Sequence, residues 1–183
     1  MPIKIRMPHI NFEFKARTAN LDALEKKLLP LNPIFFGKDQ QTDTYFNVAK
    51  GRLKLREGNI ENALIYYERQ NIADAKLSDV LLYQHQPDKS LKDILTKLHG
   101  IKVVVKKVRK IYFIENVKFH FDTIDELGTF VEVEAIDNTG DIGIEKLKEQ
   151  CGKYAELFGI KSEDYVSLSY SDMILERLEM SYE

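Results

Sequence analysis

Two short stretches decide the fold of this chain: Arg52-Leu53-Lys54-Leu55-Arg56 and Val131-Glu132-Val133-Glu134-Ala135. In both, apolar and charged residues alternate, which is the period of a β-strand with one apolar and one charged face. Each stretch carries charges of one sign, three cations in the first and two carboxylates in the second. Because like charges on one strand repel, the pattern indicates strands whose charged faces converge on ligands of opposite charge.

The same alternation extends to other parts of the chain. Residues 10–17 and 117–122 alternate in this way, and Lys107 with Arg109 forms a second same-face pair of cations. Segments of period two predict strands at 9–17, 41–48, 52–57, 62–70, 78–86, 103–114, 116–123 and 129–136. Turn residues at Glu115-Asn116 and at 125–128 connect the last three strands as hairpins, so we expect an antiparallel sheet.

Helical spacing occurs in four segments between and after the strands. It predicts helices after the cap-like Asn20, after Ser90, over 144–158 with a stop near Gly159, and over 170–178. Pro30 and Pro33 are typical of a loop, and no linker or repeat divides the sequence. We therefore expect one α+β domain over residues 1–183, a closed eight-stranded antiparallel β-barrel with a polar interior and helices packed outside.

Composition excludes several classes of protein. With 183 residues, 44% hydrophobic and 31% charged, the chain is typical of a folded globular domain. A net charge of −2 gives no global attraction to nucleic acid, so we expect no nucleic-acid partner. The single Cys151 excludes an intrachain disulfide, and no apolar run is long enough for a signal peptide or a membrane span. We expect a cytoplasmic protein without a membrane partner.

The charged faces indicate phosphate and metal chemistry. The carboxylates of Glu13, Glu132 and Glu134 are oxygen ligands suited to Mg²⁺ or Mn²⁺, which bind carboxylates together with substrate phosphates. The cations suited to phosphate oxygens are Lys15, Arg52, Lys54, Arg56, Lys107 and Arg109, with Arg69 as an addition. The pattern alone leaves one alternative open, in which these charges are the solvated face of an ordinary sheet that serves in protein interaction.

Five blocks, in order along the chain, resemble the CYTH family of triphosphate tunnel metalloenzymes, in particular its class IV adenylyl cyclase-like branch. Asn11-Phe12-Glu13-Phe14-Lys15 is similar to the family's opening ExExK signature. The other blocks are 41–46 with 52–57, 66–69, 104–112, and 120–122 with 127–134. The resemblance covers nearly the whole chain.

The resemblance implies a tunnel that binds a triphosphate with Mg²⁺ or Mn²⁺. The metal ligands would be Glu13, Glu132 and Glu134, with Asp122 as a further ligand or a neighbour of one. The phosphate-binding residues would be Lys15, Arg52, Lys54, Arg56, Lys107 and Arg109, and the catalytic residues Lys15, Glu13 and Glu134. The chain departs from the family pattern at Asn11, which replaces the first glutamate, and at Glu68, which stands where relatives often have lysine.

The expected activity is the conversion of ATP to cyclic AMP and pyrophosphate, or the hydrolysis of thiamine triphosphate, tripolyphosphate or a nucleoside triphosphate. The sequence leaves these reactions open, because they differ only in the register of the ligand along the tunnel. The alternative function is a non-catalytic binder of nucleotides or polyphosphate, which Asn11 in place of a metal ligand would favour. A homodimer is one alternative for the assembly.

Overall fold

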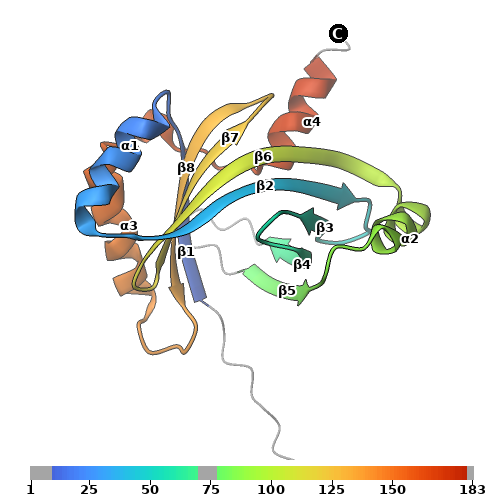
Figure 1. The fold of residues 1–183 in the computed structure, drawn as a ribbon, viewed down its shortest axis with the longest axis horizontal. Helices are drawn as coiled ribbons and strands as arrows, with labels where there is room; N and C mark the ends of the chain where they lie inside the picture. Colours follow the sequence, from blue (N-terminus) through green and yellow to red (C-terminus); the bar gives the residue numbers. More distant parts are fainter. Residues whose placement is uncertain (1–9, 70–77, 181–183) are drawn as a thin grey trace, which may run out of the picture.

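The computed structural model describes residues 10–69 and 78–180, which form one curled antiparallel sheet of eight strands with four α-helices (Figure 1). The strands are β1 (Ile10–Arg17), β2 (Ile34–Phe46), β3 (Arg52–Glu57), β4 (Ala63–Arg69), β5 (Ser78–Gln84), β6 (Ile101–Ile114), β7 (Val117–Ile124) and β8 (Gly128–Asp137). The helices are α1 (Leu21–Leu28), α2 (Lys89–His99), α3 (Ile144–Phe158) and α4 (Tyr170–Met180), with short 3₁₀ turns at Leu29–Leu31 and Ser162–Asp164.

The strand order is β1-β8-β7-β6-β2-β3-β4-β5, with every neighbouring pair antiparallel. The sheet is curled rather than flat, because Glu61, in the loop between β3 and β4, lies 2.8 Å from Lys118 on β7. The strands β1 and β5 are the two edges, and no ladder joins them within the described residues. The predicted α+β class and antiparallel sheet are confirmed, and the shape that the described residues form is a half-barrel.

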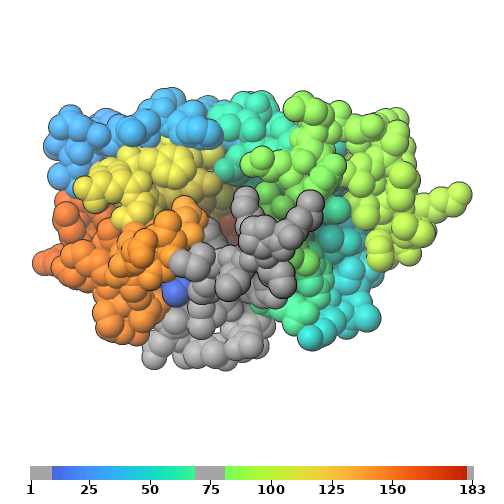
Figure 2. Space-filling view, turned by 90° about the horizontal axis from the view of Figure 1, so that it is seen from below, coloured from blue at the N-terminus to red at the C-terminus, as the bar shows by residue number. Residues whose placement is uncertain are grey.

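Helices cover the outer face of the sheet in two places. Helices α1 and α3 pack on the apolar face of β1, β7 and β8, where Phe14, Phe119 and Val133 are buried against Tyr154 and Phe158. Helix α2 packs with Leu95 on Phe46 and Leu55 at the other end. Figures 1 and 2 both place α1 and α3 at one end of the long axis and the region of α2 at the other. The charged residues of the alternating strands therefore face inward.

Helix α4 lies on the inner face. Tyr170 and Met173 pack against Tyr45, Val103 and Phe130, all of which point to the inside of the curl. Figure 1 shows α4 beside the end of the sheet where β7 and β8 turn. The polar part of the inner face is thus bounded at one end by a helix.

The predicted strand at 41–48 is too short at its start, because β2 begins at Ile34. Residues 34–36 are all apolar and lack the alternation of the later part, yet Ile34 and Phe35 pair with β6. A register shift between Phe35 and Gly37 accompanies this change of pattern. The predicted helices are confirmed, although Asp88 rather than Ser90 caps α2. His9 and Gln70, placed at strand ends by the sequence, lie outside the described residues.

None of the helices in the described ranges combines the length and apolar character that a membrane span requires.

The outer core yields a prediction for Phe119→Ala. The Phe119 ring is fully buried and makes edge-to-face contacts with Tyr154 and Phe158, at centroid distances of 4.6 and 6.4 Å. Its removal leaves a cavity, so we expect the free energy of unfolding in urea to fall by about 3–5 kcal/mol. Leu98→Ala, at a side chain that is 71% exposed, is the control and should change it by less than about 0.5 kcal/mol. Equal effects would contradict this packing.

Candidate functional site

The centre of the inner face is a buried carboxylate, Asp43 on β2. Its oxygens accept hydrogen bonds from Lys107 Nζ on β6 at 2.7 Å and from the Arg56 guanidinium on β3 at 2.8 Å twice. Lys54 Nζ lies 3.4 Å away. Burial acts to raise the pKa of Asp43, but Lys107, Lys54 and Arg56 outweigh it and hold this pKa well below its usual range. Three predicted phosphate-binding residues therefore gather around one anion.

Arg109 on β6 belongs to a second cluster. Its guanidinium donates to both oxygens of Asp122 on β7, at 2.7 and 2.6 Å, and to Glu132 on β8 at 3.2 Å. The Tyr170 hydroxyl of α4 also donates to Asp122, at 2.8 Å. Lys15 on β1 stands over the Tyr170 ring at 4.1 Å. These contacts bring Lys15, Arg109, Asp122 and Glu132 of the predicted set together.

A third cluster crosses the curl. Glu61 accepts hydrogen bonds from Arg56 at 3.0 Å, from Lys118 at 2.8 Å and from the Gln41 amide at 3.0 Å. Gln41 also donates to Asp39 at 2.7 Å. None of these carboxylates was among the sequence-predicted site residues, and neither was Lys118. They link the cations of β3 to β7, which is not a neighbour of β3 in the sheet.

Carboxylates gather where β1 and β8 pair. Glu13 lies opposite Glu134 in the register, and Asn11 donates from its amide nitrogen to Glu134. Burial first, and then the charges of Glu13 and Glu132, raise the pKa of Glu134 to about 7. The Asn11 Oδ1 atom is buried and accepts no hydrogen bond. The pairing of β1 with β8 therefore brings together excess negative charge and the unsatisfied Oδ1 atom of Asn11.

This oxygen set fits a hard divalent cation such as Mg²⁺ or Mn²⁺. Glu13, Glu134 and the Asn11 carbonyl oxygen would hold it, and a cation would relieve the repulsion among the carboxylates. In the ranges that the structure describes, no three His, Cys, Asp or Glu side chains form a ready metal cluster. The site described here is not a cluster of that kind, because it combines two carboxylates with the amide oxygen of Asn11.

His120 on β7 faces the same interior. Neither ring nitrogen has a hydrogen-bond partner, and Nδ1 lies 3.5 Å from Glu132. Burial and the nearby Arg109 lower the pKa of His120 to about 4. The low pKa favours the neutral imidazole at neutral pH.

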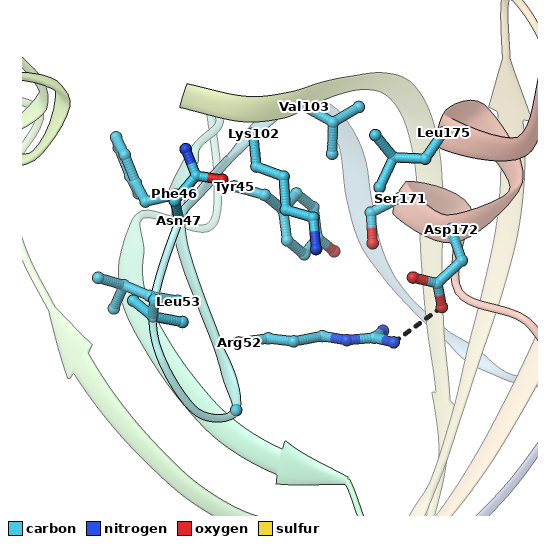
Figure 3. A pocket seen from close by; sticks show the side chains of 12 residues that line it. Tyr45, Phe46, Asn47, Arg52, Leu53, Lys102, Val103, Ser171, Asp172 and Leu175 are labelled. Atoms are coloured by element: carbon cyan, nitrogen blue, oxygen red, sulfur yellow. Dashed lines mark hydrogen bonds and ion pairs between the residues drawn. The ribbon is translucent and has the colours of Figure 1, made fainter. Parts of the chain in front are cut away.

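Arg52, the outermost cation of β3, is held by helix α4. Its guanidinium donates to Ser169 Oγ and to Asp172 Oδ2, both at 2.8 Å. Figure 3 shows this pair across a pocket between the β2–β3 turn on one side and Ser171 and Leu175 of α4 on the other. The ion pair of Arg52 is therefore with Asp172 and not with Asp43. The side chain of Arg69 lies outside the described part of the chain.

A scan of family models finds that the CYTH domain family matches residues 9–170. The chain therefore belongs to the CYTH domain family. No curated protein matches it in sequence.

Solved structures agree with this fold. The PH1012 protein of Pyrococcus horikoshii is 26% identical, with a TM-score of 0.78 over 89% of this chain and 98% of that one. A proposed adenylate cyclase of Vibrio parahaemolyticus is 18% identical, with a TM-score of 0.74 over 90% and 97%. HpAC1 of Hippeastrum, a proposed adenylyl cyclase reported to have a dominant triphosphatase activity, is 15% identical, with a TM-score of 0.62 over 88% and 92%.

The carboxylate cluster yields a prediction for the pH dependence of stability. The pKa of Glu134 is raised from 4.5 to about 7 on folding, so the stability that its protonation contributes is complete below pH 4.5 and is lost as the pH rises through 7. We expect Glu134→Gln to remove this loss. Between about pH 4 and about pH 8 the variant should gain ~3 kcal/mol of unfolding free energy relative to the wild type, measured by urea unfolding in EDTA.

Glu163→Gln, which removes an exposed carboxylate, is the control for that comparison. If both variants follow the wild-type pH profile, the excess negative charge around Glu134 is not present.

Proposed function

We propose that this protein is a divalent-metal-dependent enzyme that acts on a triphosphate. One observation carries the proposal: the same inner face holds a row of cations, centred on Arg56, Lys107 and Arg109, and a group of carboxylates with excess negative charge around Glu134. A triphosphate with its metal ion complements both groups at once. Membership of the CYTH family supports this reading.

In the proposed complex the phosphate oxygens bind the cations of β3 and β6, with Lys15, Arg52 and Arg69 as further contacts. Arg56, Lys107 and Arg109 are paired with carboxylates of neighbouring strands, so this part of the site is charged and oriented before a ligand arrives. The strands would then enclose the ligand as a closed tunnel in a single domain. Asp122 binds Arg109 through both oxygens, and its proposed role is to orient that guanidinium.

Glu13, Glu132 and Glu134, with the Asn11 oxygen, are the proposed metal ligands, and a bound Mg²⁺ or Mn²⁺ would neutralise charge on the phosphate oxygens. Lys15 lies next to Glu132 in the β1–β8 register, so it can contact a phosphate beside the metal. Lys15, Glu13 and Glu134 form the proposed catalytic set. The cations stabilise the charge that develops as the bond to the leaving phosphate breaks.

Two reactions suit this site. In hydrolysis a water attacks the terminal phosphorus, and in cyclisation the ribose 3′-hydroxyl attacks the first phosphorus. The triphosphatase activity reported for HpAC1, whose fold this chain shares, is the reason to test both. Incubation with Mg²⁺ or Mn²⁺ and ATP, thiamine triphosphate or tripolyphosphate, followed by separation of the products, identifies the reaction.

The second candidate is a non-catalytic binder of the same ligands, favoured by the neutral Asn11 among the metal ligands. Tight binding of a triphosphate in calorimetry without turnover would support it. Absence of both binding and turnover would refute both candidates.

Two substitutions test the assignment of the site. Glu134→Ala removes a metal ligand, so we expect it to abolish metal-dependent turnover. Arg56→Ala removes a guanidinium that faces the ligand, so we expect its affinity for the triphosphate to fall by about tenfold or more, measured by calorimetry.

Lys106→Ala is the matched control, because Lys106 lies on β6 beside Lys107 but is exposed and on the outer face. Its affinity and turnover should equal those of the wild type. Wild-type kinetics in both Glu134→Ala and Arg56→Ala would refute the proposed site.

A further inference from the structure

Glu61 differs from the other carboxylates of the interior because it comes from a loop. Residues 58–62 connect β3 to β4, and Glu61 extends from this loop across the curl to β7. Its side chain is 24% exposed, whereas that of Asp43, in the middle of β2, is 2% exposed. Glu61 is therefore an anion of the cation row that a ligand can reach from solvent.

The contacts of Glu61 are those that a phosphate group would make. Its Oε2 atom accepts from Arg56 and from the Gln41 amide, both at 3.0 Å, and its Oε1 atom accepts from Lys118 at 2.8 Å. Three donors from three different strands thus converge on one carboxylate. A tetrahedral phosphate oxygen group accepts hydrogen bonds from the same donors and carries more negative charge.

The positive charges around Glu61 strongly stabilise an anion at this position. Burial acts to raise the pKa of Glu61, but Lys118, Arg56 and Arg109 outweigh it and lower this pKa far below the usual range. Arg56 and Arg109 are also paired with Asp43 and Asp122, whereas the ion pair of Lys118 is with Glu61. The electrostatics at this place therefore favour a carboxylate or another anion.

The backbone of the loop is fixed independently of the side chain. Asp39, fully buried on β2, accepts hydrogen bonds from the backbone N–H groups of Ile60 and Glu61 at 3.0 and 2.9 Å. Gly58 allows this approach, since a Cβ atom there would lie 2.6 Å from an Asp39 oxygen. The Glu61 side chain can therefore rotate away while the loop stays in place.

We infer that Arg56, Lys118 and Gln41 form a phosphate-binding subsite, which the Glu61 carboxylate occupies until a phosphate group of the ligand displaces it. The inference rests on the proposed function, in which the ligand is a triphosphate, and it adds Lys118 and Gln41 to the residues that bind it. Asp43 stays in place in this exchange, because it is buried and lies in the middle of strand β2.

The test compares the affinity of wild type and Glu61→Gln for tripolyphosphate, measured by calorimetry in EDTA so that no turnover occurs. The amide is neutral and competes less for Arg56 and Lys118, so we expect the variant to bind about tenfold tighter. Without ligand the melting temperature of the variant should fall, because Lys118 loses its ion pair and Arg56 keeps only the one with Asp43. Lys118→Met should bind about tenfold more weakly than the wild type.

Glu57→Gln is the matched control. Glu57 pairs with Lys92 of α2 at 2.8 Å, and both side chains are about as exposed as Glu61, but the pair lies on the outer side of β3. Loss of the Glu57–Lys92 ion pair should leave the affinity for tripolyphosphate unchanged. If Glu61→Gln does not fold, Glu61→Asp, whose shorter side chain cannot reach both cations, should also bind more tightly than the wild type.

Binding by the wild type with equal or weaker binding by the folded Glu61 variant overturns the inference and leaves the proposed function standing. Absence of binding by the wild type and by every variant, in EDTA and again with added Mg²⁺, would overturn the proposed function as well. A purely structural role for Glu61 predicts a lower melting temperature without any gain in affinity.

Discussion

The interior of this protein depends on the ion cluster around Asp43. One carboxylate on β2 binds Lys107 from the strand on one side and Lys54 and Arg56 from the strand on the other. Strands that each carry several like charges can lie in one curled sheet only because a carboxylate separates them. The same arrangement repeats with Asp122 beside Arg109. Charge repulsion within a strand is thus offset by attraction between strands.

This arrangement suits the proposed binding of anions. The cations are oriented by buried partners, so a ligand does not have to order long flexible side chains when it binds. Around Glu134 the balance differs, because burial and the charges of Glu13 and Glu132 outweigh the single cation Lys118, and a metal ion would relieve this repulsion. One half of the inner face, on β3 and β6, therefore suits an anion, and the other half, on β1 and β8, suits a cation.

The sequence was sufficient to predict the strands with alternating residues and the cations that face inward. Arg52, Lys54 and Arg56 were predicted to share a face, and they do, because the period of two determines the side of the sheet directly. Asp43 and Glu61 were not predicted as site residues. Their role depends on the register between β2, β3 and β6 and on how far the sheet curls, and neither is encoded in a local pattern. A signal was present for Asp43, which lies two residues before Tyr45 in a block already noted, but its partners are distant in sequence.

The pairing of β1 with β8 has a consequence for the order of assembly during synthesis. Strand β1 leaves the ribosome first, yet Phe14 lies opposite Val133, near the end of the sheet-forming part of the chain. Until residues 128–137 have been made, the apolar face of β1 has neither its partner strand nor helix α3 to cover it. The hairpins of β2 to β5 and of β6 with β7 join near neighbours in sequence and can form earlier. While residues 18–127 are being made, the apolar face of β1 is therefore without the strand and the helix that cover it in the folded protein.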